Sequence, residues 1–333
     1  FDTPVPERAV MAVMTSGTTG IPKILFRSFE SWADFFAIQN AVFGVDADSR
    51  LFVQGSLAFT GNLNLYMGQL AAGGTLIAED VFLPGKWEQV MARERANGIY
   101  LIPSKLLMLP RVFKGVNANI RTIISGSQSL GRKDAEVLKK IFPNTEITLY
   151  YGASELNYIT YVKSADMTEE RNLIGKPFPG VRVFIQDDEM YVDNAFHVEN
   201  ITVPYSLKDS GRMDLQGNFY FLGRTDDIVG VRGRKVSMMK IENALEEVAG
   251  ITEAAVVLLP KEKDADMPAE IVSAFVTVEG TDVPENLRQQ LKEKLADFEI
   301  PKRVIVLEAF PKNTSGKVDK ARLKKMWIEQ EPQ

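Results

Sequence analysis

Short apolar runs alternate with amphipathic stretches along the first half of the chain. The apolar runs predict strands, which cover residues 9–14, 24–26, 51–53, 75–78, 99–102, 121–125 and 146–150. The amphipathic stretches predict helices, which cover residues 28–43, 63–71, 87–96 and 133–142. Strands that alternate with helices of about 10–15 residues indicate an α/β domain with a largely parallel sheet.

The second half of the chain carries a different pattern, because short strands replace this alternation beyond residue 175. They are predicted over residues 181–185, 190–192, 196–203 and 218–222, and a turn at 214–218 predicts a hairpin. After residue 226, strands are predicted over 254–259, 271–278 and 304–307 and helices over 239–248, 284–296 and 319–329. We therefore expect a large α/β domain over residues 1–225, ending in a short-strand subdomain, and a small α+β domain over residues 226–333.

A polar, glycine-rich segment separates the first two predicted strands and consists of Thr15, Ser16, Gly17, Thr18, Thr19, Gly20, Ile21, Pro22 and Lys23. Such a turn can aim backbone N–H groups and hydroxyls into one concavity, which suits phosphate oxygens, and the lysine adds a positive charge. The glycines are spaced too closely for a Walker A loop, and no helix signal follows the lysine. Judged by spacing alone, a polar hairpin turn is the alternative interpretation, although the less favoured one.

Two further polar segments follow predicted strands of the parallel sheet. Ser125, Gly126 and Ser127 follow one strand, and Tyr151 and Gly152 follow the next. Parallel sheets bind ligands beyond the carboxyl ends of their strands, so we expect the ligand site at this edge.

The chain has 333 residues and a net charge of −5. Its composition and charge argue against several classes of function. No basic block points to nucleic acid, and no apolar run is long enough to span a membrane. Cysteine is absent, which excludes disulfides, a thiol nucleophile and zinc–thiolate sites and fits a cytoplasmic protein. The single histidine, His197, lies in a predicted strand, and no Gly-x-Ser-x-Gly elbow accompanies it, so a Ser-His-Asp hydrolase is not expected.

The glycine-rich segment resembles the phosphate loop of the adenylate-forming superfamily, which includes acyl-CoA synthetases (AMP-dependent acid–thiol ligases), adenylation domains of peptide synthetases and luciferases. Further resemblances follow in the family's order: Tyr151-Gly152-Ala153-Ser154-Glu155, Asp209 within 207–212, Gly223-Arg224-Thr225-Asp226-Asp227, and the lysine loop at 311–317. Together they extend from about residue 10 to about residue 325. The pattern around residues 150–158 is most similar to bacterial fatty acyl-CoA ligases of Gram-positive type.

The resemblance implies ATP as a substrate, Mg²⁺ as its cofactor and CoA as the thiol co-substrate. The residues it assigns to ATP are Thr15, Ser16, Gly17, Thr18, Thr19, Gly20, Lys23, Ser125, Gly126, Ser127, Tyr150, Tyr151, Gly152, Ser154, Asp209 and Arg224. Residues 125–127 and 150–152 would bracket the adenine, with a tyrosine ring as a stacking face. Taken singly, Asp209 also fits a turn aspartate and Arg224 a solvated surface arginine.

The resemblance also implies catalytic roles. Glu155 would bind Mg²⁺, although a glutamate at a helix N-terminus is the local alternative. Lys317 would stabilise the charge that gathers between the acid and the α-phosphate. Asp226 would be the hinge of a mobile C-terminal domain, and Gly233 would line a pantetheine tunnel.

The chain departs from the family pattern at several positions. Ile24 stands where a glycine usually follows the loop lysine, and Phe59 stands where many acyl-CoA synthetases have histidine. Lys208 replaces the glycine before Asp209, and Lys235 replaces a common arginine. The phosphate loop follows soon after Phe1, so we expect either an N-terminally shortened member or a processed or partly covered chain.

The residues expected to line the acyl pocket are uncharged, and they include Phe59, Thr60, Asn62, Ala153 and Ile159, together with Ser125, Gly126 and Tyr151. Adenylation domains for amino acids generally carry an aspartate in the 59–62 region, and none is present here. This favours a carboxylic acid without an α-amine, such as a fatty, dicarboxylic or aryl acid. The leading interpretation is an ATP-dependent acyl-CoA synthetase; a ligase that loads an acyl-carrier protein and a non-catalytic nucleotide-binding homologue stay open as alternatives.

Overall fold

The computed structural model describes residues 4–15, 23–57, 59–225, 228–231, 234–261, 270–312 and 318–329. The chain divides into two compact units. The first comprises Phe1–Leu207 and Gly211–Phe221, and the second comprises Lys208–Ser210 and Leu222–Gln333. The main division therefore falls at Leu222, whereas the expected boundary was residue 226. The short segment Lys208–Ser210, which comes earlier in the chain, also belongs to the second unit.

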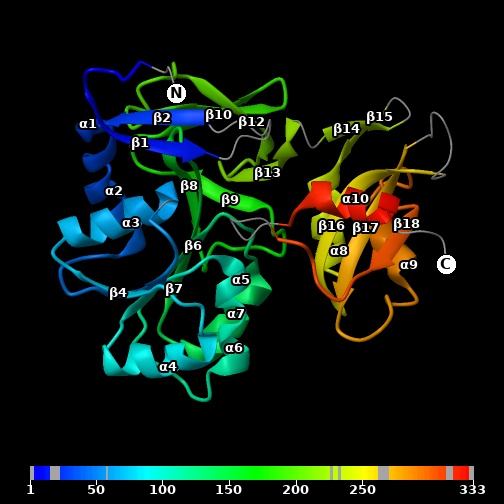
Figure 1. Cartoon of the computed structure of the whole chain (residues 1–333), viewed down its shortest axis with the longest axis horizontal. Coiled ribbons are helices and arrows are strands. Elements are labelled where there is room, and N and C mark those ends of the chain that lie inside the picture. The colour runs from blue at the N-terminus through cyan, green and yellow to red at the C-terminus, as the bar shows by residue number, and fades with distance from the viewer. Residues whose placement is uncertain are drawn as a thin grey trace. The chain divides into compact units, whose positions relative to one another are not determined.

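The strands up to this boundary are β1 (Ala9–Thr15), β2 (Lys23–Ser28), β3 (Arg50–Gln54), β4 (Thr75–Glu79), β5 (Gly98–Tyr100), β6 (Thr122–Gly126), β7 (Glu146–Ala153), β8 (Asn157–Lys163), β9 (Leu173–Pro177), β10 (Arg182–Gln186), β11 (Glu189–Asp193), β12 (Tyr205–Met213) and β13 (Phe219–Arg224). The helices are α1 (Phe29–Ala33), α2 (Phe36–Phe43), α3 (Thr60–Ala71), α4 (Pro84–Arg93), α5 (Pro103–Leu106), α6 (Leu109–Val112) and α7 (Arg132–Ile141). Figure 1 shows their arrangement.

Most of these strands belong to one 11-stranded sheet with the order β10-β11-β12-β13-β9-β8-β7-β6-β5-β3-β4. The strands from β4 to β7 pair in parallel, as the α/β pattern predicts. From β7 onward the pairings β7–β8, β8–β9, β9–β13 and β10–β11 are antiparallel. The fold is a large mixed α/β sheet, and its parallel half directs the carboxyl ends of β3, β5, β6 and β7 to one edge.

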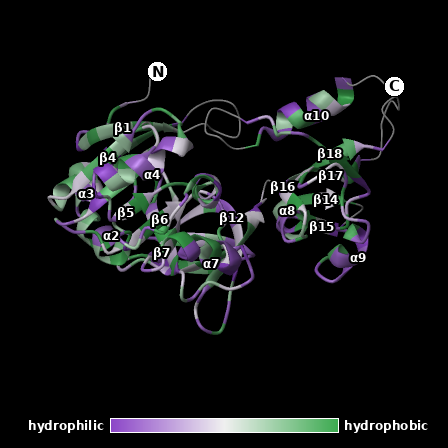
Figure 2. Ribbon diagram, turned by 90° about the horizontal axis from the view of Figure 1, so that it is seen from below, coloured by the Kyte–Doolittle hydropathy of each residue, from purple (hydrophilic) through white to green (hydrophobic). Residues whose placement is uncertain are grey.

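Both faces of the parallel strands are buried, which explains why their sequences read as continuous apolar runs. On β3, for example, Phe52 packs into one core cluster, which α4 to α7 complete, whereas Leu51 and Val53 pack into another, which α2 and α3 complete. The same alternation places Ile123 and Ile124 of β6 on opposite faces. Figure 2 shows hydrophobic colouring along these strands.

Several local predictions were wrong. The helix expected over 28–43 is divided into α1 and α2, although the hydroxyl of Ser28 caps α1 as expected by accepting from the backbone N–H of Ser31 at 3.2 Å. The strand expected over 196–203 is absent from this described segment, so His197 does not lie in a strand. The strands β8 and β12 were not predicted, whereas the hairpin turn over 214–218 is confirmed by the hydrogen bond from Asp214 N–H to the Asn218 carbonyl at 3.0 Å.

The second unit contains β14 (Ile228–Val231), β15 (Arg234–Ser237), α8 (Met238–Glu246), β16 (Ile251–Pro260), β17 (Glu270–Val278), α9 (Leu287–Lys292), β18 (Arg303–Val306) and α10 (Lys320–Glu329). Its three-stranded sheet has the order β16-β17-β18. On one face α8 contributes Ile241 and Leu245 to the core, and on the other α10 contributes Leu323. The α+β prediction agrees with these elements. No helix in the described parts of either unit is long and apolar enough to cross a membrane.

Three buried tyrosines connect β5, β7 and β8 in the first unit. The hydroxyls of Tyr100 and Tyr150 are 2.8 Å apart, and the rings of Tyr150 and Tyr158 have centroids 4.4 Å apart. Burial raises the pKa of Tyr150 to about 12 and holds the pKa values of Tyr100 and Tyr158 well above the ordinary value. These phenols therefore stay protonated in the folded state at pH values where an unfolded chain loses its phenolic protons.

We predict that the free energy of unfolding falls as the pH rises from about 10 towards 12, because the unfolded state releases these protons first. The Tyr150→Phe variant should lose stability less steeply in this window, by up to about 1.4 kcal/mol per pH unit. Urea unfolding at a series of pH values measures both slopes. Tyr191→Phe, on the β10–β11 hairpin, is the control and should keep the original slope; equal slopes for Tyr150→Phe and the unaltered chain would contradict the prediction.

Candidate functional site

The centre of the candidate site is the turn between β7 and β8, which contains Ser154 and Glu155. Both side chains are partly exposed. The backbone of the turn is fixed by neighbours: the N–H of Val198 donates to the Glu155 carbonyl at 2.9 Å, and the side-chain amide of Asn194 donates to the Leu156 carbonyl at 3.0 Å. The segment that follows β11 therefore holds this turn at the carboxyl end of β7.

The start of α3 lies against the same turn. The hydroxyls of Thr60 and Ser154 are 3.0 Å apart, so an expected acyl-pocket residue contacts an expected nucleotide-binding residue. One turn further along α3, the Asn64 amide donates to the Asn157 side chain at 2.6 Å. Since Thr60 and Asn64 are both buried, these polar contacts fix α3 against the β7–β8 turn.

The segment after β6 approaches the end of β7 very closely. A Cβ atom on Gly126 would lie 2.4 Å from Cζ of Tyr150, so only glycine fits there. Ser125 is fully buried, and its hydroxyl donates to the Leu101 carbonyl at 2.7 Å. Ser127 is exposed and has φ of 69°, which turns the chain away from the sheet. Ser125 and Gly126 are thus buried against the end of β7, and of the three residues Ser127 is the one with an exposed side chain.

The two tyrosines expected beside adenine differ in how far they are buried. Tyr150 is 6% exposed, and its ring packs against Phe43 and Tyr158 in the core, so it does not present the stacking face expected from the sequence. Tyr151 is partly exposed and its ring lies 5.8 Å from that of Phe221. Gly152 is exposed, and a Cβ atom there would lie 2.6 Å from the Asn157 carbonyl oxygen. Of the two rings, Tyr151 is the one that reaches the surface.

The expected acyl-pocket residues fall into two groups. Phe59 is 45% exposed, and Asn62 lies close by on α3 with its amide donating to the Ser56 carbonyl at 2.9 Å. Ala153 is partly exposed at the end of β7. Ile159 is fully buried in the core cluster beneath α2 and α3, so its side chain lies inside the core rather than on an accessible surface.

Part of the expected site lies outside the described residues: Ser16, Gly17, Thr18, Thr19, Gly20, Asp226, Gly233 and Lys317. The ends of the phosphate loop are described, because Thr15 of β1 pairs with Lys23 of β2 in an antiparallel register. Lys23 is exposed at this closing pair. The β1–β2 pairing therefore brings the two ends of the glycine-rich segment together.

In the second unit, Asp209 and Arg224 lie side by side. The Nε atom of Arg224 is 3.6 Å from Oδ1 of Asp209, whose side chain is 11% exposed. Lys208 has φ of 62°, the region that favours glycine, which agrees with the glycine that the family has at this position. The hydroxyl of Thr225 donates to the Lys208 carbonyl at 2.6 Å and holds this bend. An almost buried carboxylate beside a guanidinium can accept hydrogen bonds from a ribose.

The side chains of the β7–β8 turn also fit a magnesium site in which the ion is shared with substrate phosphates. Mg²⁺ is usually held by one or two carboxylates together with substrate phosphates and water, rather than by a cage of protein ligands. Glu155 supplies one such carboxylate and Ser154 a neighbouring hydroxyl. Within the described residues, no group of three histidine, cysteine, aspartate or glutamate side chains could hold a metal.

One residue of this site was missed from the sequence. Arg27 is fully buried on β2, and its guanidinium donates to the carbonyl of Ser154 at 3.0 Å. Its only signal in the sequence is a charged residue between apolar Phe26 and the helix cap Ser28.

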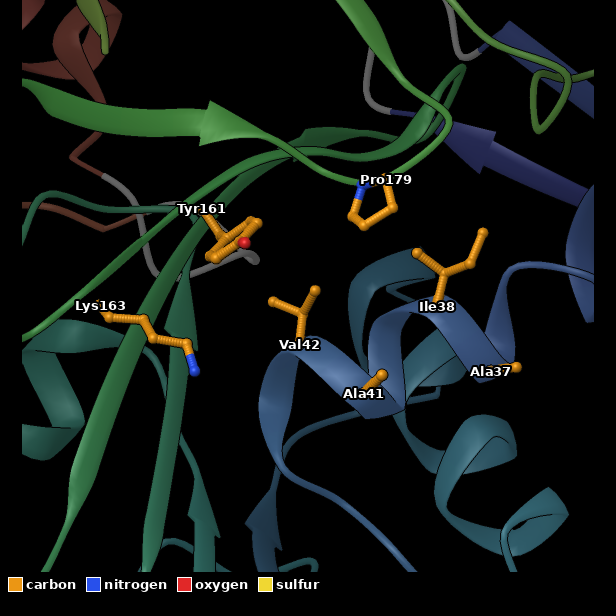
Figure 3. A pocket seen from close by; sticks show the side chains of 7 residues that line it. All are labelled: Ala37, Ile38, Ala41, Val42, Tyr161, Lys163 and Pro179. Carbon is orange, nitrogen blue, oxygen red and sulfur yellow. The ribbon is translucent and has the colours of Figure 1, made fainter. Parts of the chain in front are cut away.

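A shallow groove of about 510 Å³ lies elsewhere in the first unit, between α2 and β8. Figure 3 shows that Ile38, Ala41 and Val42 of α2 face Tyr161 and Lys163 of β8 across this groove. None of the expected site residues lines it. The groove is therefore distinct from the candidate site.

We predict that Gly126→Ala lowers the free energy of unfolding by about 1–3 kcal/mol, because the new methyl group overlaps the Tyr150 ring. Thermal or urea unfolding measures the loss. Gly85→Ala is the matched control, since a Cβ atom at Gly85 meets no atom within 4 Å, and we expect no loss of stability there. Equal stability of the Gly126→Ala variant and the unaltered chain would contradict the close packing at this edge.

Comparison with known proteins agrees with this architecture. The acyl-CoA ligase YhfT of Bacillus subtilis (strain 168), described as uncharacterized, is 27% identical over 348 residues, covering 98% of this chain and 70% of that protein. A linear gramicidin synthase of Brevibacillus parabrevis is 27% identical over 347 residues, covering 93% of this chain and 7% of that protein. The chain thus spans about 70% of YhfT and a small part of the much longer synthase.

Solved structures show the same fold. The o-succinylbenzoate coenzyme A synthetase MenE from Bacillus subtilis, solved in complex with ATP and magnesium ion, matches with a TM-score of 0.81 at 20% identity, covering 94% of this chain and 69% of that chain. At this identity the likeness concerns the fold alone. The family model described as AMP-binding enzyme matches residues 2–195, and that of the AMP-binding enzyme C-terminal domain matches residues 240–317. The chain belongs to the family of AMP-binding enzymes, whose homologues include acyl-CoA ligases.

Proposed function

We propose that this chain activates a carboxylic acid with ATP to form an acyl-adenylate, and then transfers the acyl group to the thiol of CoA. The observation that carries the proposal is the convergence of Ser154, Glu155 and Thr60 at the carboxyl end of β7, beside the segment 125–127. Ligands of parallel sheets bind at this edge. The family match and the acyl-CoA ligase homologues support the same reaction class.

In the first half-reaction, a carboxylate oxygen of the acid attacks the α-phosphorus of ATP, and the bond to the bridging oxygen of the β-phosphate breaks. Pyrophosphate leaves with the electron pair of that bond. The glycine-rich segment that ends at Lys23 would hold the β- and γ-phosphates, and Glu155 would hold Mg²⁺, which offsets phosphate charge when bound. Tyr151 and residues 125–127 would contact the adenine, and Asp209 with Arg224 would bind the ribose side.

Because the reaction brings two anions together, fixed positive charge is the main aid that the chain can supply. We assign this task to Lys317, which precedes α10 in the sequence. In the second half-reaction, the CoA sulfur attacks the acyl carbonyl, AMP leaves, and the thiol proton is released to solvent. Asp226 would be the hinge for this step, and Gly233 would line the path of the pantetheine arm.

The acid is proposed to lack an α-amine and to be fatty or of similar apolar character. Phe59, Thr60, Asn62 and Ala153 carry no charge that could pair with an ammonium group. Phe59 is exposed beside α3 and offers an apolar surface. We place the reaction in the cytoplasm, which fits a chain without cysteine.

A carrier protein is the second candidate acceptor. The linear gramicidin synthase that resembles this chain over part of its length is one observation in favour of this candidate. The phosphopantetheine thiol of a carrier has the same chemistry as that of CoA. The acceptor is therefore identified by comparing acyl transfer to CoA with acyl transfer to a carrier protein after the adenylate has formed.

We predict that a panel of fatty, dicarboxylic and aryl acids includes one that supports exchange of labelled pyrophosphate into ATP. The Lys317→Ala variant should lower this exchange by about 10²–10³-fold and still bind ATP, because it removes charge stabilisation from the transition state. Lys324→Ala, on the exposed face of α10, is the control and should exchange normally.

Normal exchange by Lys317→Ala would contradict the role of this lysine. ATP binding by the unaltered chain without exchange for any acid would favour a non-catalytic nucleotide-binding homologue. Pyrophosphate release that rises when CoA is added would support CoA as the acceptor.

A further inference from the structure

A guanidinium lies buried inside the first unit, in contact with the β7–β8 turn. Arg27 is 0% exposed, although it stands on β2, the strand that follows the glycine-rich segment. Burying a charged group is costly unless hydrogen bonds compensate it. Such a residue is therefore expected where its hydrogen bonds perform a definite task.

The guanidinium of Arg27 donates to three carbonyl oxygens from distant parts of the chain. Nη1 donates to Phe196 at 2.8 Å and to Ser31 at 3.2 Å, and Nη2 donates to Ser154 at 3.0 Å. Nε is buried and has no hydrogen-bond partner among the described residues. The planar group thus joins α1, the β7–β8 turn and the segment after β11 at one point.

Arg27 and Glu155 also attract one another. Burial lowers the pKa of Arg27 to about 10, and the charge of Glu155 opposes this shift. Arg27 therefore remains charged at neutral pH. Its hydrogen bond holds the carbonyl of Ser154, the residue next to Glu155, so the same cation fixes the backbone and attracts the carboxylate.

We propose that Arg27 is a positioning residue that orients the Glu155 carboxylate towards the magnesium ion of the bound nucleotide. It touches neither ATP nor the acid and acts through Ser154 and Glu155. This role depends on the proposed function, because only there does Glu155 bind Mg²⁺. If the hydrogen bonds of Arg27 merely joined three segments, its loss would change the stability of the chain without changing how Mg²⁺ affects the affinity for ATP.

The direct test measures the affinity for ATP by calorimetry, once with Mg²⁺ and once with EDTA, in the full chain without any acid. In the unaltered chain ATP should bind more tightly with Mg²⁺. Residues that orient a metal ligand typically change metal affinity about 10–100-fold when altered. We therefore expect Arg27→Met to lose about 10–100-fold of the Mg²⁺-dependent gain and to keep its affinity in EDTA.

Matched variants make the result specific. Glu155→Gln should lose the same gain, and Arg27→Met combined with Glu155→Gln should lose no more than either change alone. Arg27→Lys retains the charge and should restore part of the gain, and it replaces Arg27→Met if that variant fails to fold. Arg171→Met is the control, because Arg171 is a second arginine of the first unit, with a side chain 21% exposed and paired with Asp134 of α7 at 2.9 Å, and this variant should keep the full gain.

The outcomes separate the two proposals. A full or enlarged Mg²⁺-dependent gain in Arg27→Met, or an equal loss of affinity with Mg²⁺ and with EDTA, would overturn the role of Arg27 and leave the proposed function intact. An unaltered chain that binds no ATP under either condition would contradict the proposed function itself.

Discussion

Three carbonyl oxygens converge on the buried guanidinium of Arg27, and the geometry of the candidate site depends on this contact. Without this donor, each carbonyl would lose a hydrogen bond that is buried at Ser31 and partly buried at Ser154 and Phe196. The contact also connects β2, which ends the glycine-rich segment, to the turn that carries Glu155. The strand β2, which begins at Lys23, is thereby fixed to the turn that carries Glu155 within the first unit.

The parallel strands position the turn that Arg27 contacts. Because β3, β5, β6 and β7 run in the same direction, the segments that follow them gather at one edge, where Thr60 meets Ser154 and Gly126 lies against Tyr150. The buried tyrosines beneath the edge fill the core. The edge therefore combines a rigid base with partly exposed polar groups, which suits binding by positioning.

Sequence patterns predicted the parts of the fold that depend on local periodicity. The two-sided burial of β3 and β6 appears in the sequence as apolar runs, and the helices α7 and α8 appear as amphipathic stretches. The strands β8 and β12 were missed: Asn157 begins β8 with φ of 68°, and Lys208 bends β12 with φ of 62°. Both positions resemble turns in sequence, and only their neighbours in the sheet make them part of strands.

The candidate site was predicted from motifs that are local in sequence, and Arg27 was missed because its partners are not. Its contacts with Ser154 and Phe196 span 127 and 169 positions of the chain. The burial of Tyr150 and Ile159 was missed for a related reason, since α2 and α3 cover them only in the folded chain. Short motifs identify polar groups that can bind a ligand, whereas tertiary packing decides which of these groups stay accessible.

Hydrogen exchange of backbone amides, followed by mass spectrometry with and without ATP and Mg²⁺, tests most directly whether the edge formed by the ends of β6 and β7 seats the nucleotide. The account predicts slower exchange in peptides that cover residues 125–127 and 151–156 when both are added, and unchanged exchange in the β10–β11 hairpin. Unchanged exchange at residues 125–127 and 151–156, with slower exchange elsewhere in the first unit, would contradict the account.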